Sequence, residues 1–181
     1  MDAWAISRNP SGPKRNFEML TDLIAHYDEG DKLSAAFLFD VNSFNLVLKA
    51  CALCPLRSSS DDPNEHTQDI SDSPLQLALR TFALLQNNPY NVTPNHLSYS
   101  YMIECCGKNL PNNHPQRDVL IIKLFNACCN DGHLSNLVLS SIKQYKSRTG
   151  TQTPQLLRWE EYPMEYRRNV QEKIATELKR H

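Results

Sequence analysis

Residues Asp40 to Cys51 read D-V-N-S-F-N-L-V-L-K-A-C, and residues Asn95 to Cys106 read N-H-L-S-Y-S-Y-M-I-E-C-C. Aligned without a gap, the two stretches carry apolar and small residues at the same positions. The matched pairs are Phe44 with Tyr99, Val47 with Met102, Leu48 with Ile103, Ala50 with Cys105 and Cys51 with Cys106. Internal similarity of this kind predicts a repeat protein, in which each repeat buries its apolar face against a neighbour.

A second pair of similar segments alternates with the first. Residues 77–88 (L-A-L-R-T-F-A-L-L-Q-N-N) align with residues 120–131 (L-I-I-K-L-F-N-A-C-C-N-D), which places Phe82 on Phe125 and Arg80 on Lys123. Two helix types that alternate along a chain are typical of an α-solenoid. We therefore predict an all-α fold, an α-α superhelix of stacked, right-handed helix hairpins, closed by a C-terminal capping helix and a charged tail.

Apolar spacing and capping residues predict the individual helices. Leu20, Leu23, Ile24 and Tyr27 follow helical spacing, so the first helix is expected over 16–27. The next should begin after a cap at Ser43 or Asn42, and Pro55 should stop it. The further expected helices are Pro74 to Asn87 behind a Ser73 cap, Ser98 or Asn95 to Asn109, Gln116 to Asn130, and Leu134 to about Lys146.

The repeats are expected to occupy residues 16–147. Residues 1–15 should form a flexible N-terminus. Residues 55–74 hold almost no apolar side chains and are predicted to be a disordered acidic insertion, because such a segment cannot offset its own ordering entropy. Residues 148–181 should form a linker and a charged helix that is solvated over most of its surface.

Composition excludes several classes of protein. The chain has 181 residues and a net charge of −1, so it lacks the strongly basic character of many nucleic-acid-binding domains. Its apolar runs are too short to cross a membrane, which predicts a soluble protein without a membrane partner. No transit peptide is visible at the start of the chain. No nucleophile elbow, phosphate loop or H-E-x-x-H motif is present either, so we expect no enzyme and no small-molecule substrate.

Six cysteines leave two interpretations open. Cys51 and Cys54 have the spacing of half a zinc site, whereas the adjacent pairs 105–106 and 128–129 make a poor disulfide framework. Cys51 aligns with Cys106, where packed helices favour a small residue, and buried free cysteines behave as small apolar side chains. We therefore predict reduced thiols and no metal or cofactor.

The two first-helix segments resemble a known family. Residues 41–51 (V-N-S-F-N-L-V-L-K-A-C) and 96–106 (H-L-S-Y-S-Y-M-I-E-C-C) are similar to the first helix of a pentatricopeptide repeat. The segments 74–85 and 118–129 resemble the second helix of that repeat. Residues 162–170 (Y-P-M-E-Y-R-R-N-V) are similar to a tail that follows pentatricopeptide-like repeats in algal proteins.

The resemblance implies non-catalytic binding of single-stranded RNA, one base per repeat, in organellar RNA processing, stability or translation. The residues that would read a base map onto Asn45 and Asn95 in the first full repeat and onto Ser100 in the second. Asn42 and Leu97 fall where the family sandwiches the base, in place of its usual valine. The location that the resemblance implies is the mitochondrion or the plastid.

Basic residues are candidates for phosphate contacts if their helices share the inner face of the solenoid. They are Lys49, Arg57, Lys108, Lys143, Lys146 and Arg148.

Two other functions remain open at this stage. A scaffold of the tetratricopeptide kind would hold a protein or peptide on the same inner face. A positive inner face would favour RNA, and a neutral, apolar one a peptide. Some RNA-cleaving enzymes join similar repeats to a metal-dependent domain, and the acidic residues between 61 and 72 invite that comparison, but they lack an apolar frame to hold ligands in place.

Overall fold

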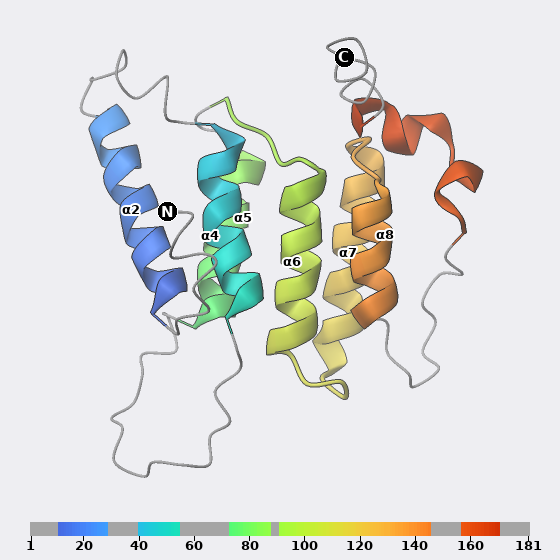
Figure 1. Ribbon diagram of the computed structural model, residues 1–181, viewed down its shortest axis with the longest axis horizontal. Coiled ribbons are helices and arrows are strands. Elements are labelled where there is room, and N and C mark those ends of the chain that lie inside the picture. Colours follow the sequence, from blue (N-terminus) through green and yellow to red (C-terminus); the bar gives the residue numbers. More distant parts are fainter. Residues whose placement is uncertain (1–10, 29–39, 55–72, 88–90, 146–156, 171–181) are drawn as a thin grey trace, which may run out of the picture. The chain divides into compact units, whose positions relative to one another are not determined.

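The computed structural model describes residues 11–28, 40–54, 73–87, 91–145 and 157–170, and every regular element in these ranges is helical (Figure 1). An all-α fold was predicted, and the described residues agree with it. Residues 55–72 of the insertion expected over 55–74, the first ten residues, residues 146–156 and the end of the charged tail lie outside them. The last two residues of that expected insertion, Ser73 and Pro74, instead cap and begin a helix.

The helices begin and end close to the predicted residues. They are α2 (Gly12–Asp28), α4 (Val41–Leu53), α5 (Pro74–Asn87), α6 (His96–Asn109), α7 (Pro115–Asn130) and α8 (Asn136–Tyr145), followed by the short 3₁₀ helices η2 (Trp159–Glu161) and η3 (Met164–Arg167). Ser73 caps α5 as predicted, since its hydroxyl accepts the backbone N–H of Gln76 at 3.3 Å.

Two predicted helix starts were wrong. α2 begins at Gly12, so residues 12–15 are helical and do not belong to a flexible N-terminus. Pro13 is tolerated there because the first-turn N–H groups of a helix have no partner within the helix. The cap of α4 is Asp40, whose carboxylate accepts the N–H groups of Asn42 and Ser43, so neither of those residues is the cap.

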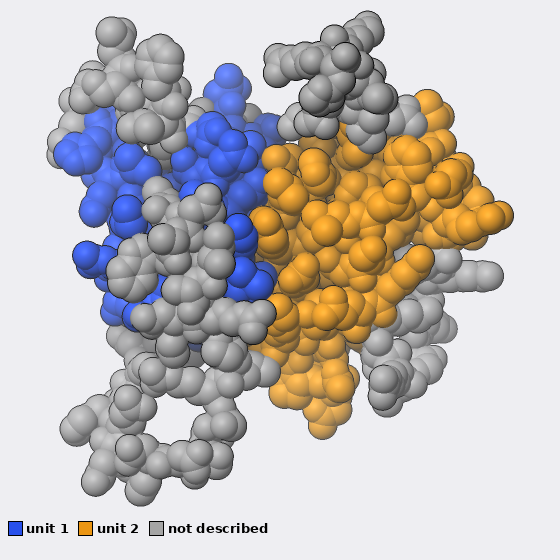
Figure 2. All heavy atoms as spheres, in the orientation of Figure 1, with its two compact units in different colours: residues 1–94 blue, residues 95–181 orange. Residues whose placement is uncertain are grey.

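The chain divides into two compact units, residues 1–94 and 95–181, which Figure 2 colours separately. In the first unit α2, α4 and α5 pack against one another. Its core is apolar, with fully buried Leu20, Phe44, Val47, Leu48, Leu77 and Leu85. In the second unit α6 packs against both α7 and α8, and η3 packs on α7. Its fully buried side chains include Tyr99, Met102, Ile103, Leu134 and Val138.

Burial repeats with the sequence. Along α4 the half-buried or exposed positions between 41 and 53 are Val41, Asn42, Leu46, Lys49 and Leu53, and the corresponding positions of α6 are His96, Leu97, Tyr101, Glu104 and Lys108. The remaining positions of these segments are buried in both helices. The capping geometry repeats too, because Asn95 accepts the N–H groups of Leu97 and Ser98 as Asp40 does at α4. The structure therefore has a repeat-like helical architecture.

The C-terminal segment 157–170, called the C-terminal clip below, is bound to the turn between α7 and α8. Trp159 donates its indole N–H to the carbonyl of Leu134 at 3.0 Å, and the N–H of Leu134 donates to the carbonyl of Tyr166 at 2.7 Å. Asn169 donates its backbone N–H to the Gly132 carbonyl at 3.0 Å. Most residues of this segment are exposed, as expected for a solvated tail, but Tyr162 and Val170 are buried.

Gly132 makes this turn possible. α7 ends in a Schellman motif, in which the N–H of Gly132 donates to the carbonyl of Cys129 and the N–H of His133 to that of Cys128. The motif requires a left-handed residue, and Gly132 has a φ of 73°. A Cβ at this position would lie 3.0 Å from the carbonyl oxygen of Glu165, so glycine also gives the C-terminal clip the space to approach.

Candidate functional site

The structure places the predicted base-reading residues inside the helix packing. Asn45 is 5% exposed and Ser100 is fully buried. The Ser100 hydroxyl lies 2.8 Å from that of Ser141 on α8. In this conformation neither side chain presents an open edge to a ligand.

Asn95 has a structural task. Its side-chain oxygen accepts the N–H groups of Leu97 at 3.0 Å and of Ser98 at 3.1 Å, and the hydroxyl of Ser98 accepts the backbone N–H of Asn95. This reciprocal pair is a capping box, which satisfies unpaired N–H groups at the start of α6. With 7% of its surface exposed, Asn95 contributes to the helix start.

The two residues expected to sandwich a base lie on accessible surface. Asn42 is exposed in the first turn of α4, where its amide donates to the Asp40 carboxylate at 2.7 Å. Leu97 is half-buried in the first turn of α6. Both occupy the same position of their helices and mark the start of a longer accessible stripe.

Each first helix presents one such stripe. We call Asn42, Leu46, Lys49 and Leu53 the α4 stripe, and Leu97, Tyr101, Glu104 and Lys108 the α6 stripe. Their members are three or four residues apart, so they lie along one side of each helix. Lys49 and Lys108 were among the predicted phosphate contacts. Lys143 is exposed on α8, and Arg57, Lys146 and Arg148 lie outside the described residues.

Sequence analysis missed the other stripe members, namely Leu46, Leu53, Tyr101 and Glu104. Their aligned spacing was available in the sequence. However, an alignment of repeats identifies the positions that are alike. Leu46 differs from its aligned residue Tyr101, and Lys49 differs from Glu104, so the alignment did not mark these positions.

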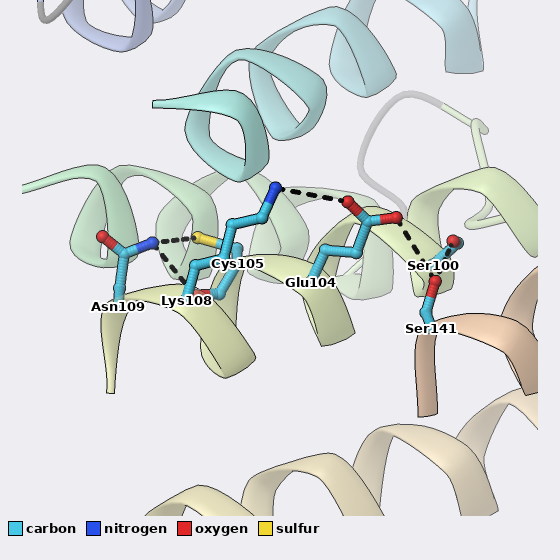
Figure 3. A network of polar contacts seen from close by, with 6 residues as sticks. All are labelled: Ser100, Glu104, Cys105, Lys108, Asn109 and Ser141. Atoms are coloured by element: carbon cyan, nitrogen blue, oxygen red, sulfur yellow. Dashed lines mark hydrogen bonds and ion pairs between the residues drawn. The ribbon is translucent and has the colours of Figure 1, made fainter. Parts of the chain in front are cut away.

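A network of polar contacts lies under the α6 stripe (Figure 3). Ser141 on α8 donates its hydroxyl proton to a carboxylate oxygen of Glu104 at 3.3 Å, and the other carboxylate oxygen lies 3.7 Å from the Lys108 ammonium group. Because Ser141 has one proton, the 2.8 Å contact with Ser100 must be donated by Ser100. The chain of donors thus runs from Ser100 through Ser141 to Glu104 and fixes the carboxylate in place.

Charged groups of α6 and α7 act on the end of α8. Burial raises the pKa of Tyr145, the negative charge of Glu104 raises that pKa further, and the positive charge of Arg117 lowers it. Arg117 is itself buried, and its guanidinium donates to the side-chain oxygen of Asn112. Glu104 therefore lies at the junction of a stripe that a ligand can reach and a packed polar interior.

The cysteines are buried free thiols. Burial raises the pKa of Cys51 and Cys128 strongly, and raises the pKa of both Cys106 and Cys129 to about 11. Thiolates are the metal-binding and nucleophilic form of cysteine, so these environments disfavour both roles. Within the described ranges, no three His, Cys, Asp or Glu side chains come together as metal ligands. The acidic residues considered for a nuclease lie outside these ranges.

Comparison with known proteins gives no match: no family model, no curated protein and no solved structure is similar to this chain. Among the described helices, none combines the length and the apolar character needed to cross a membrane.

Proposed function

We propose that this chain is a non-catalytic helical-repeat protein that binds single-stranded RNA along the accessible stripes of α4 and α6. The observation that carries the proposal is that equivalent positions of the two first helices are accessible in the same register. A protein whose surface repeats is suited to a ligand that also repeats, and an RNA strand presents one base and one phosphate per nucleotide.

The chemistry of the stripes suits this ligand in part. Lys49 and Lys108 offer ammonium groups for phosphates, and Tyr101 offers an aromatic ring on which a base can stack. Lys108 forms an ion pair with Glu104 that is partly exposed to water, at 33% and 23% of the two side chains. Pairs of this kind contribute little stability, so the ammonium group can exchange this partner for a phosphate at small cost.

We also propose a solenoid arrangement of the helices and an organellar location. The α4–α5 and α6–α7 hairpins are proposed to be successive repeats of a short right-handed α-solenoid, with α8 and the C-terminal clip as its cap. The bonds of the clip to the α7–α8 turn support a capping role in the second unit. A role in mitochondrial or plastid RNA processing, stability or translation rests on the resemblance to pentatricopeptide repeats.

A protein-interaction scaffold is the second candidate, and the composition of the stripes favours it. The two stripes together carry the apolar side chains Leu46, Leu53, Leu97 and Tyr101, two lysines, one glutamate and one asparagine. A surface that is half apolar and nearly neutral is typical of a contact with protein, because RNA binding draws much of its affinity from positive charge.

Fluorescence anisotropy with a short labelled single-stranded RNA tests the proposal at several salt concentrations. We expect affinity that falls with salt and drops further in Lys49→Ala/Tyr101→Ala/Lys108→Ala. The control is Lys123→Ala/Lys143→Ala, which removes exposed lysines of α7 and α8 outside the stripes. Equal losses in both variants would contradict binding at the stripes, and absence of RNA binding at low salt would leave the scaffold.

A further inference from the structure

Glu104 is an acceptor that the fold holds in a fixed orientation on accessible surface. Ser141 donates to one of its carboxylate oxygens at 3.3 Å, and Lys108 lies 3.7 Å from the other. A carboxylate has about four lone-pair sites. Each oxygen therefore keeps capacity for one more donor, and the Glu104 side chain as a whole is 23% exposed.

Two parallel acceptors select a ligand with two parallel donors. Among the four RNA bases, guanine alone has adjacent N–H donors on its Watson–Crick edge, at N1 and at the N2 amino group. Cytosine and adenine offer one amino group beside an acceptor, and uracil offers one N–H between two carbonyls. Single-stranded RNA exposes these edges to side chains. Paired hydrogen bonds to an ionised group are also stronger and more selective than single ones.

From this geometry we propose that Glu104 binds the Watson–Crick edge of a guanine and makes the second repeat selective for that base. The inference rests on the proposed RNA binding and deepens it. Tyr101 lies three residues earlier on the same stripe, where its ring can support the base whose edge Glu104 binds.

The first repeat lacks this chemistry. Its equivalent positions hold Leu46 and Lys49, an apolar side chain and a donor, so it offers neither the aromatic ring nor the paired acceptors. The selectivity for guanine is therefore a property of the second repeat.

Ser141 and Ser100 are positioning residues in this arrangement. They orient the carboxylate without contact with the base, because both are buried and Ser141 uses its proton on Glu104. A preoriented acceptor loses less entropy on binding than a mobile one, so loss of the Ser141 hydroxyl should weaken the selectivity.

The test uses the full chain and labelled uridine-rich RNAs that carry a single guanosine, inosine, adenosine or cytidine at the same place. We expect the guanosine probe to bind about tenfold more tightly than the adenosine and cytidine probes. Inosine keeps N1–H but lacks the N2 amino group, so it should lose most of this preference. 7-Deazaguanosine keeps both donors and should retain it.

Two pairs of variants separate the roles. Glu104→Gln should abolish the preference, because an amide cannot accept from both donors. Lys123→Gln on α7, which lies outside both stripes, should leave the ratio of guanosine to adenosine affinity unchanged. Ser141→Ala should lower that ratio, and Ser141→Thr, which restores a hydroxyl, should recover it. Circular dichroism of each variant checks that the helices are intact.

The outcomes are distinct. Equal affinity for all four probes, or a preference that survives Glu104→Gln, would overturn the guanine contact and leave RNA binding in place. Absence of binding to any probe would overturn both proposals. Binding of an arginine-bearing peptide through Glu104, without RNA binding, would assign the α6 stripe to a protein partner.

Discussion

Gly107 provides a quantitative test of the packing between α6 and α8. A Cβ built at this position would lie 2.2 Å from Cγ and 2.7 Å from Cβ of Tyr145. These atoms are the root of the tyrosine side chain, so a small rotation of the ring cannot make room. Gly107→Ala therefore forces α8 away from α6 or drives Tyr145, now 8% exposed, into solvent.

The expected cost follows from two opposing contributions. Loss of the burial of a large side chain costs about 1.5–3 kcal/mol. Replacement of glycine by alanine within a helix contributes a gain of about 1 kcal/mol. The net prediction is a decrease of about 0.5–2 kcal/mol in the free energy of unfolding.

Urea unfolding followed by circular dichroism, in a double-mutant cycle with Tyr145→Ala, measures this coupling. Once the ring is removed, the helix preference should dominate, and Gly107→Ala should stabilise by about 0.5–1 kcal/mol. The reversal of sign is the decisive result. An increase in stability from Gly107→Ala in the wild-type background would refute the close approach. Ala52→Gly at the aligned position of α4 is the matched control, with an expected cost of about 1 kcal/mol or more.

Three further predictions concern stability. Gly132→Ala places a Cβ at a φ of 73° and 3.0 Å from the carbonyl oxygen of Glu165. It should lower the free energy of unfolding by about 1–2 kcal/mol and make the C-terminal clip more sensitive to limited trypsin digestion. Unchanged digestion would contradict the packing of the clip on the α7–α8 turn. Asn16 is fully buried, and its amide has no hydrogen-bond partner among the described residues. Asn16→Leu should therefore increase the free energy of unfolding by about 1–2 kcal/mol, measured as a higher urea midpoint. Burial raises the pKa of Cys106 and Cys129 from 9.0 to about 11, so the unfolded chain loses these thiol protons at lower pH than the folded chain does. The free energy of unfolding should therefore be at its full value below about pH 9 and fall as the pH rises towards about 11. A urea midpoint that stays constant between these pH values would contradict the burial.

The helices could be predicted from sequence because their signals are local. The signals at the start of α5 are Ser73 and Pro74, and those at the start of α6 are the Asn95 cap and the apolar spacing after it. These signals act within a few residues of the helix start, and both helices begin where they predict. The alignment of the first helices also gave the correct register of burial. Asp40 was missed as a cap because Asn42 and Ser43 are equally good capping residues, and the choice among three neighbours depends on the backbone entering the helix.

The position of the C-terminal clip could not be read in the same way. Its charged sequence fits a solvated helix, and its bonds to the α7–α8 turn join residues that are far apart in the chain, such as Tyr166 with Leu134 and Asn169 with Gly132. The accessible stripes depend on packing for the same reason. The burial of Ser100 requires Ser141 of α8, a partner that no pattern within α6 indicates.

The candidate site illustrates how a repeat separates its framework from its surface. The positions that are alike in α4 and α6, such as Phe44 with Tyr99, are buried and specify the helix packing. The position occupied by Lys49 in one repeat and Glu104 in the other is accessible, and its side chains have opposite charge. A change there alters what the surface attracts without a change in the core. Under the proposed RNA binding, selectivity is encoded where the two helices differ, and the Ser100–Ser141 contact serves to orient Glu104.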